Sequence, residues 1–286
     1  MLIQSTGREM CKRREITSPI YQRSTRALRY HARVSTQALR ATPRLLVAAS
    51  ALFFAAAYFA IRFPDAPGAG VASYASTLLI ALPSFTALLK YLGARRAALG
   101  LLAVAAVGYV VETIGVVTGL PYGSFYYGDA LGGKLLGLVP YLLPLSYAPL
   151  VIGAVAASWS SDLPRRVLWV FRSALLLTLI DGVLDPGAVS LGFWVWPGGG
   201  AYYGVPLSNY AGWLLSGALA AALLLAAGRW REPPLPDLLD SAALALAFWT
   251  GVAAFSGLVF PALLGAALFA YVLRSRAKMT QGERSV

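Results

Sequence analysis

Residues 97–117 read AALGLLAVAAVGYVVETIGVV, and they carry the clearest structural signal in the chain. The stretch contains one charged side chain, Glu112. A membrane-spanning helix needs about 20 mostly apolar residues, because the hydrocarbon core of a bilayer is roughly 30 Å thick. The stretch therefore predicts a transmembrane helix that holds a carboxyl group at membrane depth.

Apolar stretches of similar length recur on both sides of this one. Of the 286 residues, 58% are hydrophobic and 13% are charged, about half the charged fraction of a soluble domain. We predict an all-α fold, a polytopic membrane helix bundle with about eight transmembrane helices. The predicted spans are residues 45–61, 72–89, 97–117, 135–157, 167–184, 207–227, 239–255 and 258–273. The last two form one apolar run, which predicts either a tight hairpin or a single kinked helix.

The 24 Lys and Arg residues indicate the orientation of these spans. With the N-terminus inside, 21 of them fall in inside segments, two (Arg62 and Lys134) fall outside, and Arg172 lies within a span. Cytoplasmic loops of membrane proteins carry such an excess of Lys and Arg. We therefore predict that both termini are cytoplasmic and that the protein is a multi-pass protein of the plasma membrane. The net charge of +12 then reflects orientation and gives no reason to expect a nucleic-acid partner.

Composition divides the chain into three parts. Residues 1–43 are rich in Arg, Ser and Thr and lack the apolar segment of a signal peptide. We expect a basic, disordered cytoplasmic tail that rests on anionic lipid, with a start codon assigned too early as the alternative. Residues 44–275 form the predicted membrane-integral helical domain, and residues 276–286 form a second cytoplasmic tail.

The scarcity of Cys and His excludes several kinds of site. The chain has one cysteine, Cys11, and one histidine, His31. An internal disulfide framework, a Cys-built zinc site, a His-ligated metal centre and a Ser-His-Asp triad are therefore not expected. The sequence also lacks a phosphate-binding loop and a dinucleotide fingerprint. We predict no metal site.

Four ionisable residues are predicted at membrane depth: Glu112, Arg172, Asp181 and Asp185. Such residues are costly in a bilayer and usually functional. Asp181 and Asp185 are four residues apart, so they share one helix face if the helix continues that far. The three acids fall in the same leaflet and predict a shared functional cavity; hydrogen-bonded carboxylates that hold helices together are the alternative. For Arg172 we favour snorkelling or a structural ion pair.

Two loops rich in Gly, Pro and aromatic residues follow the predicted acids. The first is TGLPYGSFYYG at residues 118–128, and the second covers residues 192–210. Pro-Leu-Ser, followed by a tyrosine, occurs at residues 144–147 and again at 206–210, which suggests a parallel repeat. We expect the loop aromatics to line the site, although interfacial anchoring would also explain them. These candidates are Tyr122, Tyr126, Trp194, Trp196 and Tyr203.

A carboxylic acid in an apolar pocket with aromatic walls suits proton-initiated chemistry on an alkene. A desolvated carboxyl group can stay protonated near neutral pH and act as a general acid. Aromatic faces stabilise a cation that forms beside them. A second, ionised carboxylate can position a water molecule and accept its proton.

Four motifs resemble those of the membrane-integral carotenoid hydratases. They are Glu-x-x-Gly-x-x-Thr-Gly-x-Pro-Tyr-Gly at residues 112–123, Asp-Pro-x-Ala at 185–188, GFWVW at 192–196 and GVPLSNYAGW at 204–213. The family includes carotenoid 1,2-hydratases and bisanhydrobacterioruberin hydratases, and the resemblance covers roughly residues 45–275. The basic composition is unlike that of haloarchaeal proteins, so a C40 carotene is the expected substrate.

The resemblance implies cofactor-independent hydration of the ψ-end of a lycopene-like or γ-carotene-like substrate in the lipid bilayer. It suggests Glu112 or Asp181 as the proton donor and Asp185 as the water-positioning base, or the reverse. The loop aromatics would line a cation pocket. Asn209 would hydrogen-bond the water or a carboxylate, with an interhelical hydrogen bond or a helix cap as the alternative. Other carotenoid-pathway enzymes are possible partners.

Three other functions use similar residues. A carotene cyclase would apply the same acid and cation chemistry but exclude water. A prenyltransferase or elongase would need Asp-rich magnesium motifs, and Asp181 and Asp185 supply only one such pair. A transporter would use the acids as a proton relay, which the clustering of the acids near one face disfavours.

Overall fold

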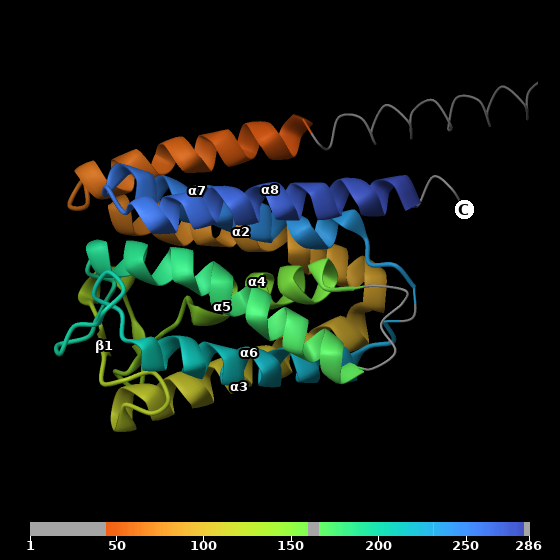
Figure 1. Cartoon of the computed structure of the whole chain (residues 1–286), viewed down its shortest axis with the longest axis horizontal. Coiled ribbons are helices and arrows are strands. Elements are labelled where there is room, and N and C mark those ends of the chain that lie inside the picture. The colour runs from red at the N-terminus through yellow and green to blue at the C-terminus, as the bar shows by residue number, and fades with distance from the viewer. Residues whose placement is uncertain (1–43, 160–165, 231, 283–286) are drawn as a thin grey trace, which may run out of the picture. The chain divides into compact units, whose positions relative to one another are not determined.

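The computed structural model describes residues 44–159, 166–230 and 232–282 (Figure 1). The predicted N-terminal tail, with Cys11 and His31, lies outside the described residues. The chain separates into a unit of residues 1–45 and a unit of residues 46–286, and the second unit forms the bundle described here.

The bundle is all-α, as predicted, and its helices are long and apolar. Within the described residues, seven helical segments are long and apolar enough to cross a membrane, while α4 is shorter. A polytopic membrane helix bundle is therefore confirmed, whereas the orientation of both termini stays a prediction. The helices are Arg44–Arg62, α2 (Ala69–Leu92), α3 (Ala94–Thr118), α4 (Leu143–Ala157), α5 (Arg166–Ser190), α6 (Leu207–Ala227), α7 (Asp240–Phe255) and α8 (Val259–Gly282), with 3-10 turns η1 (Asp129–Leu131) and η2 (Pro236–Leu239).

The predicted span at residues 135–157 differs most from the structure. Its first third forms a hairpin, in which β2 (Lys134–Leu135) pairs with β3 (Val139–Pro140). Leu136 and Gly137 make the turn in left-handed backbone conformations, with φ of 51° and 73°. An apolar run by itself does not distinguish helix from strand. The remaining α4 has 15 residues and measures about 22 Å.

Helix α4 is short, and it lies inside the bundle. Every residue from Tyr147 to Ala157 is buried, as expected for a helix that is apolar all round. Small residues let its neighbours approach closely: a Cβ added at Gly153 would come within 2.6 Å of the Ala242 side chain on α7. Such small contacts are typical of helix packing in membranes.

The last apolar run is the tight hairpin, one of the two predicted alternatives. Helix α7 ends at Phe255 and α8 begins at Val259. Gly257 adopts φ of 73°, and the Leu258 amide donates a 2.8 Å hydrogen bond to the Ala253 carbonyl, which are features of a glycine-terminated helix.

Two loops meet at one end of the bundle, at the left of Figure 1. The loop between α3 and α4 contains β1 (Tyr126–Tyr127), and the loop between α5 and α6 contains β4 (Trp194–Val195). The two strands pair antiparallel, with Tyr127 opposite Trp194. This pairing joins the loops that connect α3 to α4 and α5 to α6, and two of these helices, α3 and α5, carry the predicted acids.

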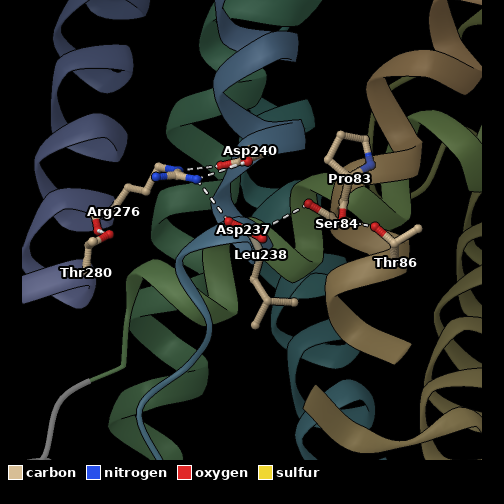
Figure 2. A network of polar contacts seen from close by, with 8 residues as sticks. All are labelled: Pro83, Ser84, Thr86, Asp237, Leu238, Asp240, Arg276 and Thr280. Carbon is tan, nitrogen blue, oxygen red and sulfur yellow. Dashed lines mark hydrogen bonds and ion pairs between the residues drawn. The ribbon is translucent and has the colours of Figure 1, made fainter. Parts of the chain in front are cut away.

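A buried ion-pair network joins α8 to η2 and α7 (Figure 2). Arg276 Nε donates a 2.6 Å hydrogen bond to Asp240, and Arg276 Nη2 donates a 2.9 Å bond to Asp237. Beside it, Ser84 Oγ on α2 donates to the Leu238 carbonyl at 2.9 Å. Helix α8 continues to Gly282, beyond the predicted span end at residue 273, because Arg276 is paired and buried against the bundle.

Candidate active site

Asn209 joins the two predicted aspartates. Its Nδ2 atom donates hydrogen bonds to Asp181 Oδ2, at 3.1 Å, and to Asp185 Oδ2. All three side chains are at most 2% exposed. The two aspartates lie one turn apart on α5, and Asn209 is in the first turn of α6. The sequence suggested a hydrogen bond from Asn209 to water or to one carboxylate. In the structure the Asn209 amide donates to both carboxylates.

The aspartates share a face because α5 continues through Pro186. A proline inside a helix removes one backbone hydrogen bond and leaves the carbonyl four residues earlier without a donor. That carbonyl belongs to Gly182, and the Tyr202 hydroxyl donates to it at 3.1 Å. The helix therefore runs to Ser190, past the predicted span end at residue 184.

Glu112 is held by a tyrosine of the first loop. The Tyr127 hydroxyl donates a 2.7 Å hydrogen bond to Glu112 Oε2. Burial, and then the charge of Glu112, raise the pKa of the Tyr127 phenol well above its usual range. Tyr127 therefore stays protonated and remains a donor to the carboxylate.

The three acids, which we call the acid cluster, lie close enough to interact. Glu112 interacts electrostatically with Asp185, and Asp181 interacts with Glu112. The Trp194 indole hydrogen-bonds Asp185 and packs edge-on against the Tyr127 ring at 5.9 Å. The paired strands β1 and β4 thus connect the Glu112 side of the acid cluster to the aspartate side.

The predicted loop aromatics lie at different distances from the acid cluster. Tyr122 is buried and interacts with Glu112 and Asp181, and Trp194 contacts Asp185. Trp196 is also buried, and its indole donates to the Tyr122 carbonyl at 3.1 Å. Tyr126 is 51% exposed at the surface, and Tyr203 is 36% exposed, its hydroxyl accepting from the Phe260 amide. The structure does not bring these last two tyrosines to the acids.

Four residues that the sequence analysis did not select complete the site: Tyr127, Tyr147, Tyr210 and Ser216. Tyr210 interacts electrostatically with both aspartates, and Tyr147 interacts with Glu112 and Asp181. Tyr147 and Tyr210 are the tyrosines that follow the two Pro-Leu-Ser segments, and that repeated pattern could have identified them.

Three polar atoms of the site are buried and lack a hydrogen-bond partner among the described residues. They are Asp181 Oδ1, the Tyr210 hydroxyl and Ser216 Oγ. Buried polar atoms are nearly always hydrogen-bonded in proteins, so these atoms are available to a substrate or a water molecule.

The acid cluster has no basic partner among the described residues. Within residues 44–159, 166–230 and 232–282, no Lys or Arg forms an ion pair with these acids. Arg172 lies exposed on α5, and it takes part in none of the ion pairs of the described residues. In the same parts of the chain, no group of three or more His, Cys, Asp and Glu residues is arranged to hold a metal ion.

A family model described as "Carotenoid biosynthesis protein" matches residues 68–272. The chain belongs to the carotenoid biosynthesis protein family. This confirms the family suggested by the four motifs. The match contains the entire acid cluster and its partners, and it begins after the helix Arg44–Arg62.

A curated relative is the bisanhydrobacterioruberin hydratase of Haloarcula japonica. It is 40% identical over 186 residues, which cover 61% of this chain and 63% of the relative. The match therefore spans slightly less than two thirds of that relative. No solved structure matches this member of the carotenoid biosynthesis protein family.

Proposed function

We propose that the protein is a carotenoid hydratase that adds water across the terminal C1=C2 double bond of a ψ-end carotene. The observation that carries the proposal is the acid cluster: three carboxyl groups on α3 and α5 interact electrostatically, among apolar helices and aromatic side chains, and none of them is in an ion pair within the described residues. The hydratase name of the 40% identical relative supports the same reaction type.

The reaction needs one proton donor and one proton acceptor. A protonated carboxyl group transfers its proton to C2, and the π electrons of the double bond form the new C–H bond, leaving a tertiary cation at C1. A water oxygen bonds to C1, and a carboxylate takes the proton that the water loses. Glu112 or Asp181 is the proposed donor and Asp185 the proposed base, or the reverse. The residues supply the complete reaction, so we propose no cofactor.

The side chains around the acid cluster are suited to stabilise the positive charge that develops at C1 of the carotene. A cation at C1 is stabilised by nearby carboxylates and by aromatic faces. Trp194 hydrogen-bonds Asp185, and Tyr122 interacts electrostatically with Glu112 and Asp181. The Trp196 indole donates to the Tyr122 carbonyl. A carotene is soluble in lipid, so we propose that it enters from the bilayer of the plasma membrane.

Expression in cells that accumulate lycopene tests this function. Pigments are separated by chromatography, and their molecular masses are measured by mass spectrometry. A hydratase yields a product heavier by one water; an unchanged pigment profile contradicts the proposal. Products of unchanged mass with altered ring absorption would instead indicate a cyclase.

Variants of the acid cluster test the site. Asp185→Asn and Glu112→Gln should each reduce conversion by about 10²-fold or more, the usual contribution of a proton-transfer group. Asp129→Asn is the matched control, because Asp129 is a fully exposed loop acid paired with Lys134. Immunoblots of the membrane fraction verify equal protein levels. Full activity in both site variants would refute the assignment.

A further inference from the structure

Pro186 makes the helical arrangement of the two aspartates unfavourable on local grounds. It lies inside α5, one residue after Asp185. A proline disfavours helical backbone angles at the residue before it, and it removes the hydrogen bond to the carbonyl four residues earlier. Asp181 and Asp185 nevertheless lie one turn apart on a continuous helix, where both accept from Asn209. Contacts from outside α5 therefore have to stabilise this stretch.

Tyr202 makes such a contact at the point that Pro186 disrupts. Its hydroxyl donates a 3.1 Å hydrogen bond to the Gly182 carbonyl, which is the carbonyl four residues before the proline. Gly182 lies between Asp181 and Asp185 in the chain. The bond thus supplies a donor to the helical turn that holds both acids.

Residues 202–205, called the Tyr202 turn here, form a compact turn against the end of α5. Tyr202 and Val205 exchange backbone hydrogen bonds of 3.2 and 3.0 Å, and Tyr203 and Gly204 have φ of 52° and 86°. Positive φ at both central residues is characteristic of a tight type I′ turn. A Cβ added at Gly204 would lie 3.2 Å from the Val189 side chain of α5. The Tyr202 side chain therefore extends from a well-defined backbone.

The Tyr202 turn leads directly into α6. Pro206 follows it at the N-cap, and Asn209, in the first turn of α6, donates to both aspartates. The Tyr202 ring also packs edge-on against the Tyr210 ring, with centroids 5.7 Å apart. One short segment, residues 202–210, thus contacts α5 twice: Tyr202 bonds the backbone between the aspartates, and Asn209 bonds their side chains.

Another proline of the bundle has a partner of a different kind. Near Pro83 in α2, the Ser241 hydroxyl of α7 accepts from the Ser84 amide at 2.9 Å and donates to the Ala81 carbonyl at 3.3 Å. That partner is on a neighbouring helix, which is typical of membrane helices that contain proline. At Pro186 the donor comes from a loop, so the order of α5 around the acids depends on the position of that loop.

We propose that Tyr202 is a positioning residue of the hydratase, and that its hydroxyl keeps Asp181 and Asp185 on one face of α5 by replacing the hydrogen bond that Pro186 removes. The effect on catalysis rests on the proposed function. Without the hydroxyl, this turn of α5 loses a bond, and Asp185 is free to move away from Asn209. A misplacement of about 1 Å can lower a rate about 100-fold.

A double-mutant cycle with Pro186 tests the role of Tyr202. Tyr202→Phe removes the hydroxyl and keeps the ring. For purified full-length protein in lipid vesicles with lycopene, we expect kcat to fall about tenfold, within the range that misplaced groups cause. Pro186→Ala restores a backbone donor to Gly182, so in that background Tyr202→Phe should change kcat little. A loss of equal size in both backgrounds, or no loss in either, would overturn the positioning role.

Hydrogen–deuterium exchange provides a readout that does not depend on activity. Mass spectrometry of the peptide that covers residues 180–192 should show faster amide exchange in Tyr202→Phe than in wild type, and no such increase when Pro186→Ala is also present. Tyr271→Phe is the matched control, because the Tyr271 hydroxyl donates to the Ala157 carbonyl of α4 at 3.2 Å, and it should leave exchange and kcat unchanged.

The exchange measurement also separates the two proposals. Unchanged exchange in Tyr202→Phe would contradict the role of Tyr202, even if Pro186→Ala were itself inactive. Wild-type protein that forms no hydrated product would overturn the proposed function, while exchange would still decide whether Tyr202 stabilises α5.

Discussion

Asn209 shows how one amide can organise two carboxyl groups. An amide nitrogen carries two hydrogens, and here each is directed at a different aspartate. The two carboxyl groups are thereby held side by side on one face of α5. We therefore propose Asn209 as a positioning residue for the acid chemistry.

We expect Asn209→Leu, which keeps the volume and removes both donors, to lower hydration about tenfold or more. The two carboxyl groups would lose their shared donor, at a cost of about 1–3 kcal/mol for each buried group left unsatisfied. Conversion of lycopene per unit of membrane protein measures the effect. Ser208→Ala, the exposed neighbour on α6, should retain wild-type conversion; equal activity in both variants would argue against the positioning role.

At the scale of elements, the sequence predicted helices better than loops. Apolar length was enough to locate the helix of residues 207–227, whose bounds agree with α6. The hairpin at β2 and β3 was missed because its residues are as apolar as those of a membrane helix. Asp181 and Asp185 could be selected from local spacing, since a helix fixes which residues share a face.

The partner of Glu112 could not be predicted in the same way. Tyr126 and Tyr127 are adjacent in β1 and point to opposite faces, as in any strand. Which of them faces inward depends on the register between β1 and β4, and this register is formed by a loop more than 60 residues later in the chain. From the sequence alone, Tyr126 and Tyr127 are equally good candidates, and the strand pairing brings Tyr127 to Glu112.

The ion-pair network on α8 leads to a stability prediction. Arg276→Met would leave Asp240 buried without its cation, and loss of one partner of a buried pair costs about 3–5 kcal/mol. We expect a clear fall in the unfolding temperature of the purified protein in detergent. Lys278→Met, an exposed position two residues later, should change it little. A similar temperature for Arg276→Met and wild type would mean that this network contributes little to stability.

For the whole molecule, the two Pro-Leu-Ser segments have equivalent places in the fold. One begins α4 and the other begins α6, each after a loop that follows an acid-bearing helix. Tyr147 and Tyr210 both reach the acid cluster. The second segment has one extra residue before its tyrosine, and that residue is Asn209.

The orientation predicted from the positive charges can be measured on the whole protein. In a Cys11→Ser background, Asp129→Cys should react with a membrane-impermeant maleimide on intact cells. Lys278→Cys should react only after the cells are permeabilised. Both positions are exposed, so burial would not block the reagent. The reverse pattern would contradict a cytoplasmic C-terminus.

The position of the acid cluster along the bundle affects how a carotene with two reactive ends is processed. Glu112 is six residues from the end of α3 and Asp185 is five from the end of α5, about 8–9 Å in each case. An extended C40 polyene is about as long as the hydrocarbon core is thick, roughly 30 Å. If the proposed substrate lies along the helices with one end at the acid cluster, its far end is in the opposite leaflet. The molecule must leave and turn round before that end can react. Conversion should therefore be distributive: singly hydrated pigment should accumulate before any doubly hydrated pigment, and a time course of pigment masses measures this order.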